Sequence, residues 1–408
     1  MRIGLLFLFA AAFLTVAEER VTMTGKVVDA SGKPVDDATV MVYEAGVKKG
    51  YSVFCPTCWT DCGKHVITDS EGTFTIPGLN PDLWFTLLAM RDGYASTYVK
   101  KVDPAKGPAE NAVLKPRAPI PDPSQAVRGT IVDVHGMSVK DAVIEQQGVT
   151  FKGPDGRVGT RFGGSDDWID ALAVSNEKGE FELAFGKPAM QMILQVTPRG
   201  MAPKLFTAAT GADRKTMTVT DGATIRGRLV YDGKPVANAE VGITTHTRLS
   251  GSTYNEMRIG TREDGTFAIT GVPAGRIWMV YPKMESLTAQ NIGVNAVPVE
   301  TKDDGQEVSI GDIELKPAYI LRGRVVLSDG KPMPPDMRVT ISADQAWDSQ
   351  VVTIDSEGKF EFRGLPAGVF SVDAGLRGYH SPYRVTEVLV NRDIDNLVLR
   401  MLPGTGRP

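Results

Sequence analysis

The residues best suited to chemistry in this chain are three cysteines that lie close together, followed by a histidine. They are Cys55, Cys58 and Cys62, with His65 three positions later. This spacing supplies three thiolates and one imidazole, enough for a closed tetrahedral shell around zinc, and the thiolates also suit copper. The segment 55–65 is therefore a candidate metal site.

Two other kinds of chemistry fit the same segment. In an oxidising compartment, Cys62 paired with Cys55 or Cys58 would clip a small loop and leave one free thiol. The pair Cys55 and Cys58 also has the Cys-x-x-Cys spacing of thiol redox proteins, although the helix and the thioredoxin frame that activate such a pair are not visible here. At the level of sequence, the disulfide, metal and redox interpretations all stay open.

A second candidate site lies in a glycine-rich stretch, residues 152–170, which we expect to be a long loop between strands. Trp168 stands there beside Asp166 and Asp167. An aromatic face stacks on the apolar face of a sugar ring, and neighbouring carboxylates bind its hydroxyl groups. The alternative is a solvated loop with one tryptophan held against the protein.

The motifs of common enzymes are missing from the sequence. It has no glycine-rich phosphate loop, nucleophile elbow or Ser/His/Asp pattern. The formal net charge is −4, and basic and acidic residues are interspersed, which argues against a nucleic-acid surface. We therefore predict a protein that is not an enzyme, has no catalytic residues and does not bind nucleic acid.

The elements that must position these residues are short strands in a fourfold repeat. Each unit starts with a glycine before an apolar strand and later has a polar turn that ends in glycine and phenylalanine. The starting glycines are Gly25, Gly129, Gly227 and Gly323, and the turns are 69–74, 176–181, 263–267 and 355–360. The period of roughly 95–105 residues matches one β-sandwich domain. The fold class is therefore all-β, with tandem sandwiches.

One turn illustrates why this pattern recurs. In the last repeat, Gly358 suits a backbone position that needs positive φ, and the Asp355 side chain can bond to the backbone two residues further on. Phe360 is then expected to point into the core.

The domain organisation follows from these repeats. We predict sandwiches at 18–117, which carries the cysteine segment, at 126–220, which is divergent, at 221–317 and at 318–402. A proline-rich linker is expected at 118–125 and a disordered tail at 403–408. Because the last two sandwiches abut, we expect a semi-rigid rod that projects loops along its length.

The first seventeen residues have the pattern of a secretory signal peptide. Arg2 precedes an apolar run from Leu5 to Leu14, and Ala17 ends a small-residue cleavage site. No later stretch approaches 18 apolar residues, so we expect a mature chain without a transmembrane segment. The expected location is the periplasm, the cell surface or the extracellular space.

The repeated residues resemble the carboxypeptidase regulatory-like domain. The resemblance rests on the segments 25–29, 32–35, 38–40, 69–74 and 365–368. It is strong in the first, third and fourth units and loose in the second. It implies a transthyretin-like, seven-stranded Greek-key sandwich, also grouped as carbohydrate-binding-like, of a kind that serves as spacer or accessory domain in exported bacterial proteins.

The resemblance does not extend to peptidase activity. Zinc carboxypeptidases hold their metal through a His-x-x-Glu pair, and none of the four histidines is followed by glutamate three positions later. The function expected from sequence is a binding or structural module at the cell envelope that contacts a protein or glycan surface. The alternative is an accessory metal-binding or thiol-redox protein that acts through Cys55, Cys58, Cys62 and His65.

Overall fold

The computed structural model describes most of the chain. The described residues are 20–50, 56, 59, 61–118, 122–162, 172–184, 189–245, 257–335, 337–343, 346, 348–382 and 386–404. The predicted signal peptide and five of the candidate site residues (Cys55, Cys58, Asp166, Asp167 and Trp168) lie outside these ranges. Within them, no helix has the length and hydropathy of a membrane span.

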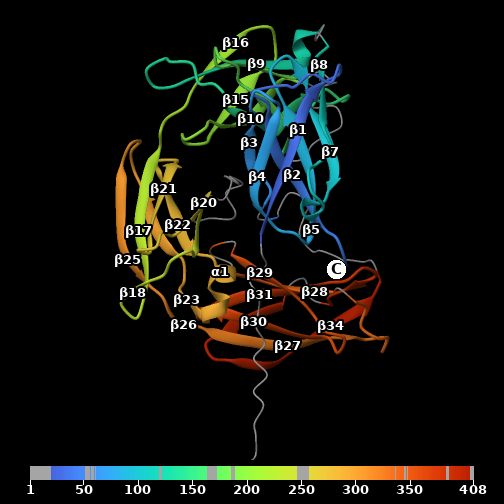
Figure 1. The fold of residues 1–408 in the computed structure, drawn as a ribbon, viewed down its shortest axis with the longest axis vertical. Helices are drawn as coiled ribbons and strands as arrows, with labels where there is room; N and C mark the ends of the chain where they lie inside the picture. The colour runs from blue at the N-terminus through green and yellow to red at the C-terminus, as the bar shows by residue number, and fades with distance from the viewer. Residues whose placement is uncertain are drawn as a thin grey trace, which may run out of the picture.

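The protein is all-β, which confirms the predicted fold class (Figure 1). The described strands form pairs of sheets that we call sandwich one (20–118), two (122–219), three (222–317) and four (319–404). In the described part of the chain, helix is confined to α1 (Met284–Leu287) and the 3₁₀ turns η1 (Pro104–Lys106), η2 (Pro123–Gln125) and η4 (Thr288–Gln290). The exact domain boundaries stay a prediction.

Sandwich one contains the sheets β4-β1-β8-β6 and β3-β2-β5-β7. Its strands are β1 (Val21–Asp29), β2 (Thr39–Val47), β3 (His65–Ile67), β4 (Thr73–Leu79), β5 (Leu83–Met90), β6 (Tyr94–Ala95), β7 (Thr97–Val102) and β8 (Ala112–Pro116). Alternate residues of β4, namely Phe74 and Ile76, are buried against residues of β2 and β5 in one apolar core. This period-two burial is what the alternating sequence predicts.

Sandwich two contains the sheet β13-β9-β16 and a second sheet, β11-β10-β14-β15, in which β12 also pairs with β10. Its strands are β9 (Ala126–Val132), β10 (Val143–Lys152), β11 (Val158–Phe162), β12 (Leu172–Val174), β13 (Glu180–Ala184), β14 (Gln191–Thr197), β15 (Lys204–Ala209) and β16 (Arg214–Thr218). The expected long loop over 152–170 is wrong in its first part, because β11 pairs with the end of β10 and forms a hairpin there.

Sandwich three contains β18-β17-β21, with β25 also on β17, and the sheet β20-β19-β22-β24. Its strands are β17 (Ala223–Tyr231), β18 (Lys234–Pro235), β19 (Glu240–Thr245), β20 (Met257–Gly260), β21 (Thr266–Val272), β22 (Arg276–Pro282), β24 (Val297–Thr301) and β25 (Glu307–Glu314). A small extra pair, β23 (Ile292–Gly293) with β26 (Lys316–Pro317), leads toward sandwich four.

Sandwich four contains β30-β27-β34-β32 and β29-β28-β31-β33. Its strands are β27 (Tyr319–Leu327), β28 (Arg338–Ala343), β29 (Ser349–Thr353), β30 (Lys359–Leu365), β31 (Gly368–Gly375), β32 (Tyr379–His380), β33 (Thr386–Val390) and β34 (Ile394–Pro403). In all four sandwiches the first strand lies between an antiparallel partner and the last long strand, which runs parallel to it.

A contact between glycine and phenylalanine recurs at the same place in each sandwich. A Cβ added to Gly25 in β1 would lie 2.4 Å from the Phe74 ring, and the equivalent distances at Gly129, Gly227 and Gly323 are 2.3, 2.6 and 2.4 Å. The phenylalanine ring therefore lies directly across the first strand. In sandwich one, the amide of Val27 also donates to the carbonyl of the turn residue Gly72, at 2.8 Å.

The predicted turn chemistry is confirmed in the last repeat. Gly358 has a φ of 82°. The Asp355 carboxylate accepts hydrogen bonds from the amides of Glu357 and Lys359, at 2.9 and 2.8 Å. Phe360 is 5% exposed and belongs to the core of sandwich four.

The segment between sandwiches one and two differs in part from the expected extended linker. Its last residues form the 3₁₀ turn η2, in which the Asp122 side chain accepts a hydrogen bond from the Ser124 amide, at 2.9 Å. A proline at the start of such a turn has no amide hydrogen to leave unbonded, so the same proline-rich composition suits both structures.

The expected rod is wrong, because the chain turns back on itself. In Figure 1, sandwich two lies at the top, sandwich three at the left, and sandwich four runs beneath sandwiches three and one. The Arg338 guanidinium of β28 donates to the Lys49 carbonyl of sandwich one, at 2.9 Å. The first and last sandwiches are thus in direct contact.

The junction of sandwiches three and four is tightly bonded, as their short connection suggests. Asn291 donates from its side chain to the Ala318 carbonyl and accepts from the Gly364 amide, both at 2.9 Å. A Cβ on Gly293 would lie 2.8 Å from the Gly364 carbonyl oxygen. Two backbones therefore approach closely here, which fixes the angle between the sandwiches.

The glycine–phenylalanine contact makes a direct prediction for stability. Gly25→Ala should lower the free energy of unfolding of sandwich one by about 2 kcal/mol, because the added methyl group overpacks against Phe74. Gly46→Ala in β2 is the matched control, since no described atom lies within 4 Å of its Cβ position. Urea denaturation of both variants provides the measurement, and equal losses in the two would contradict the prediction.

Candidate functional site

The connection that follows the second long strand of each sandwich (β2, β10, β19 or β28) differs among the sandwiches. In sandwich one it is the cysteine segment between β2 and β3. In sandwich two it contains the β10–β11 hairpin, and in sandwich four it is the short stretch between β28 and β29 that ends at Asp348. Binding residues often lie in such connections on a rigid scaffold. We therefore examine each connection where the structure describes it.

In the cysteine segment, the described residues are organised around a buried carboxylate. Asp61 is 1% exposed and accepts hydrogen bonds from Arg20 at 2.8 Å, from Lys64 Nζ at 2.7 Å and from the Asn80 amide at 3.0 Å. Two cations thus compensate one buried charge. This arrangement fastens the segment to the sandwich, because an unpaired carboxylate there would carry a large desolvation cost.

Cys62 and His65 have different surroundings in the structure. The Cys62 thiol packs against the core of sandwich one and donates to the Pro56 carbonyl, at 3.4 Å. Burial, assisted by the charges of Asp61 and Glu44, raises the pKa of this thiol to about 12. His65 is exposed on β3, where its Nδ1 lies 3.0 Å from the Gly63 carbonyl oxygen.

These surroundings bear on the predicted chemistry. A protonated thiol is a poor nucleophile and must lose its proton before it binds a metal, so the raised pKa of Cys62 opposes both reactions unless a metal ion lowers it. Cys62 is a free thiol among the described residues, and these residues contain no group of three metal-ligating side chains. Because Cys55 and Cys58 lie outside the described ranges, the zinc or copper site and the disulfide alternative stay predictions.

The candidate sugar-binding residues are also untested. Asp166, Asp167 and Trp168 lie outside the described residues, in the stretch that follows β11 and precedes β12.

A cluster of charges that sequence reasoning missed lies where sandwiches one, three and four meet. Arg258 of β20 is largely buried, which lowers its pKa, and the charges of Glu240, Asp348, Glu285 and Asp61 oppose that shift. Its guanidinium lies 3.5 Å from the Glu240 carboxylate. These acidic groups come from three sandwiches, so no local sequence pattern brings them together.

Asp348 is a deeply buried carboxylate of this cluster, with 3% of its surface exposed. One of its oxygens accepts a hydrogen bond from the Met284 amide of α1 at 2.7 Å, and the other has no hydrogen-bond partner among the described residues. Lys283, which is 4% exposed, and Arg258 supply compensating positive charge. Burial nevertheless dominates and raises the pKa of Asp348 to about 6.

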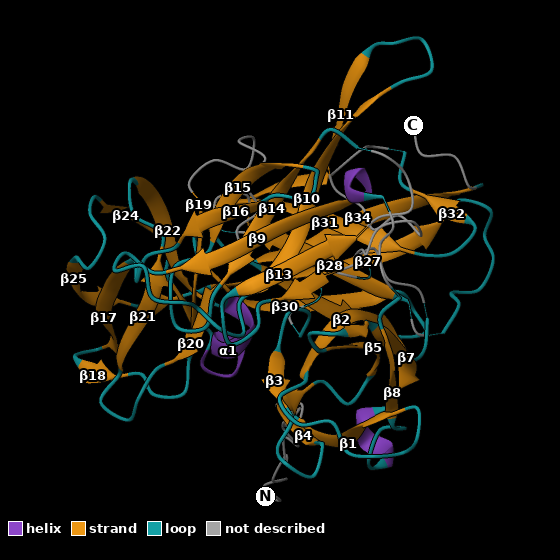
Figure 2. Ribbon diagram, turned by 90° about the horizontal axis from the view of Figure 1, so that it is seen from above, coloured by secondary structure: helices purple, strands orange, loops and turns teal. Residues whose placement is uncertain are grey.

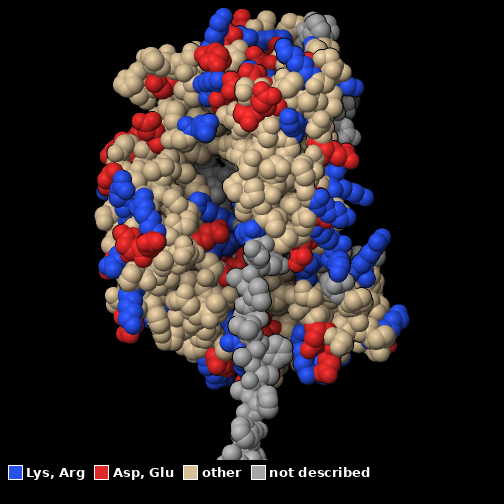
Figure 3. Space-filling view, viewed as in Figure 1, with Lys and Arg blue, Asp and Glu red and all other residues tan. Residues whose placement is uncertain are grey.

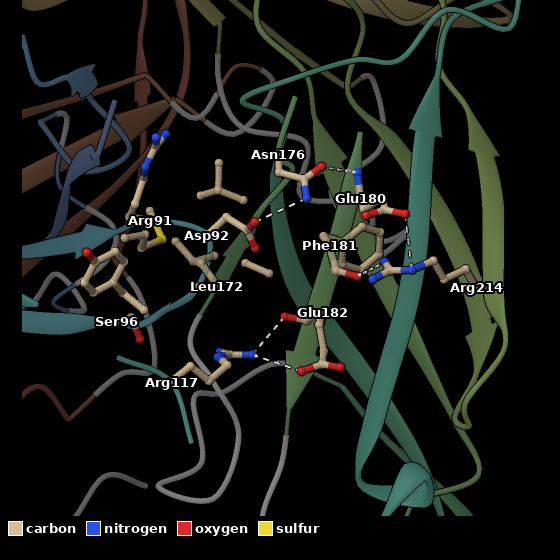
Figure 4. A pocket seen from close by; sticks show the side chains of 15 residues that line it. Arg91, Asp92, Ser96, Arg117, Leu172, Asn176, Glu180, Phe181, Glu182 and Arg214 are labelled. Carbon is tan, nitrogen blue, oxygen red and sulfur yellow. Dashed lines mark hydrogen bonds and ion pairs between the residues drawn. The ribbon is translucent and has the colours of Figure 1, made fainter. Parts of the chain in front are cut away.

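A polar crevice lies at the seam between sandwiches one and two (Figure 4). Its volume is about 210 Å³, and an adjoining crevice of about 310 Å³ shares part of its lining. Arginines and carboxylates line it in pairs. Arg117 donates to the Glu182 carbonyl at 3.1 Å, and Arg214 Nε lies 3.6 Å from a carboxylate oxygen of Glu180.

Some of the charges around this crevice join the two sandwiches, and others pair within one sandwich. Lys140 of sandwich two lies 2.7 Å from Asp37 of sandwich one and 2.6 Å from Glu177, and these hydrogen bonds raise its pKa. Arg91 donates to the Asp37 carbonyl at 3.0 Å. An apolar cluster adds to the seam and consists of Leu88, Met90, Val143 and Leu172, with Met41, Tyr43 and Val174 against it. The seam therefore reads as a structural interface.

The surface in Figure 3 carries interspersed basic and acidic side chains. Such a mixture favours solubility and specific contacts over binding to a polyanion.

Comparison with known proteins finds one family model that matches part of the chain. Residues 22–115 and 320–400 match the model of the carboxypeptidase regulatory-like domain. This confirms the predicted resemblance for sandwiches one and four. Sandwich three, where a strong resemblance was expected, lies outside the matched residues, although its sheet β20-β19-β22-β24 has the same strand order as β29-β28-β31-β33 of sandwich four.

Among curated proteins no match is found. Solved structures with a detectable likeness include the Bacillus anthracis TIE protein (13% identity, 90% of this chain, 68% of that chain, TM-score 0.21). They also include a streptococcal ancillary pilin (13%, 70% and 100%, 0.22) and BcpA, the major pilin subunit of Bacillus cereus (12%, 74% and 100%, 0.18). Because these scores are low, we draw no functional inference from them.

The buried thiol supports a prediction about reactivity. In a Cys55→Ser/Cys58→Ser variant, Cys62 should react with iodoacetamide at pH 8 on the order of 10²–10³ times more slowly in the folded protein than in denaturant. The physical reason is the raised pKa, which leaves little thiolate. Comparable rates in both states would contradict the assigned burial.

Asp348 supports a prediction about pH dependence. Its pKa of about 6 in the folded protein lies above the ordinary value of 3.8, so the folded state binds more protons between these pH values. Stability should therefore be greater near pH 4.5 and fall as the pH rises through 6. Asp348→Asn should flatten this dependence and raise the free energy of unfolding at pH 7.5 by about 2 kcal/mol. This value is lower than the free energy that the whole pKa shift of an isolated carboxylate would correspond to, because the charges of the cluster are coupled.

Asp348→Ala is the matched control for that experiment, because it also loses the hydrogen bond from the Met284 amide. Thermal unfolding from pH 4.5 to 7.5 measures all three proteins. If Asp348→Asn is destabilised at pH 7.5 as strongly as Asp348→Ala, the carboxylate stabilises the junction in its ionised form and the prediction is wrong.

Proposed function

We propose that this chain, whose residues 22–115 and 320–400 match the model of the carboxypeptidase regulatory-like domain, is an exported, non-catalytic protein that serves as a binding or structural module at the cell envelope. The observation that carries the proposal is where the ionisable side chains lie. In the described residues, clusters of charged side chains at the interfaces join one sandwich to another.

The closed arrangement of the sandwiches supports a scaffold. Sandwiches one and two share an apolar and ionic seam, three and four share backbone contacts, and Arg338 joins four to one. Several independent contacts of this kind restrict relative motion, which a protein that presents surfaces to a partner requires. The partner would be a protein or glycan surface.

The alternative function, metal binding or thiol redox chemistry by the cysteine segment, gains no support from the described residues of that segment. Cys62 is held protonated by burial, and Asp61 is engaged by Arg20 and Lys64. Metal analysis of the reduced protein addresses the remaining half. Stoichiometric zinc or copper that is lost in Cys58→Ser would favour a metal-binding role.

Fractionation of cells tests the proposed function. An epitope-tagged full chain should appear in the envelope or the medium and should be accessible to protease before the cytoplasm is opened. A variant without residues 1–17 should stay in the cytoplasm, because it lacks the expected signal peptide. Recovery of the full chain only from the cytoplasm would refute the proposal.

A further inference from the structure

The β10–β11 hairpin of sandwich two extends beyond its sheet. β10 is paired with β14 as far as Thr150, which lies opposite Gln191, whereas its pairing with β11 continues to Lys152 opposite Val158. The end of the hairpin is therefore a two-stranded ribbon, and Figure 2 shows it projecting from the body of the molecule.

The tip of this hairpin is well defined by its own hydrogen bonds. The Gly153 amide donates to the Arg157 carbonyl at 2.7 Å, and the Gly156 amide donates to the Gly153 carbonyl at 2.9 Å. Gly156 has a φ of 81°, and the Asp155 side chain accepts from the Arg157 amide at 3.1 Å. The turn is closed in the way expected of a Gly-Pro-Asp-Gly sequence.

The hairpin carries positive charge on a chain whose net charge is negative. Lys152, Arg157 and Arg161 outnumber Asp155, whereas the whole chain has a formal charge of −4. The Arg157 side chain is 90% exposed, so its 3.5 Å contact with Asp155 leaves its charge accessible to a partner. Beside these charges, Val158 is 59% exposed.

One edge of the hairpin is open. β11 pairs with β10 on one side, and no described strand pairs with its other side. An open edge presents a row of backbone donors and acceptors that another strand can bind. A two-stranded ribbon is only marginally stable in water, so an added third strand would stabilise it.

In sandwiches one and four, the described part of the equivalent connection contains a buried carboxylate, namely Asp61 in sandwich one and Asp348 in sandwich four. In sandwich two, by contrast, Lys152 and residues 154–158 are exposed. The structure thus leaves this connection available for a contact outside the chain.

We propose that an extended, acidic peptide segment of a partner protein adds to the open edge of β11 as a third strand. This inference rests on the proposed function as a binding module and names its surface and the chemistry of its partner. Side chains alternate between the two faces of β11, so Arg157 and Arg161 lie on one face, and Val158 lies on the other with its pairing partner Lys152. Backbone hydrogen bonds provide the attachment, and carboxylates of the peptide meet Arg157 and Arg161. Apolar side chains at alternate positions of the peptide contact Val158.

Binding of a designed peptide to the purified full chain tests the inference. The probe is a fluorescein-labelled octapeptide of alternating glutamate and valine, and fluorescence anisotropy at low salt measures its affinity. We expect a Kd below about 1 mM and at least a tenfold loss in Arg157→Glu/Arg161→Glu. Lys33→Glu/Lys331→Glu is the matched control, because both lysines are exposed on turns of other sandwiches, and it should bind as the unchanged chain does.

Two further probes separate strand addition from attraction by charge alone. The same peptide with prolines in place of the valines has no amide hydrogen at those positions and should bind at least tenfold more weakly. Heparin, which has charge without a peptide backbone, should not displace the peptide at equal charge concentration. Equal binding of the proline peptide, displacement by heparin, or no binding of the probe would each overturn the inference.

The outcome is distinguishable from that of the proposed function. A chain that stays in the cytoplasm but binds the peptide refutes the function and leaves the edge contact intact. A chain that is exported but does not bind refutes the edge contact alone.

Discussion

The fold depends on the contact between a glycine of the first strand and a phenylalanine from the strand after the polar turn. Without a Cβ at the glycine, the aromatic ring lies across the strand at a distance that a side chain would prevent. The turn is thereby held against the first strand, and the Gly72 carbonyl accepts from the Val27 amide. This contact sets the register of the two strands, and register decides which side chains face the core.

A register that is fixed in this way leaves the connections free to differ. All four sandwiches retain the same pairing of their first strand, whereas the connection after the second long strand (β2, β10, β19 or β28) changes in length and chemistry. In sandwich one the segment contributes a buried carboxylate, Asp61, that fastens it to its own sandwich, and in sandwich four it contributes Asp348 to the junction with sandwich three. In sandwich two it becomes a projecting hairpin with an open edge. Differences among these connections, on the same strand pairing, thus give rise both to buried contacts within the protein and to a projecting hairpin.

The buried charges show the cost of closing the chain on itself. Asp61 retains two cations and a backbone amide, so its charge is well compensated. Asp348 is also buried but has one oxygen without a hydrogen bond among the described residues, and burial raises its pKa despite Lys283 and Arg258. Such groups define how sandwiches fit together, because they are satisfied in one arrangement and not in others. Their contribution to stability is smaller and depends on pH.

The strand pattern, the turns and the sandwich class could be predicted from sequence, because these follow from local spacing of glycine, phenylalanine and alternating apolar residues. The same spacing located the cysteine segment in a connection, although the chemistry of Cys55 and Cys58 stays a prediction. The return of sandwich four to sandwich one and the half-buried position of Cys62 beside an exposed His65 became evident in three dimensions alone. These features depend on contacts between residues up to 289 positions apart. Local patterns carry no information about the free energy of such distant contacts.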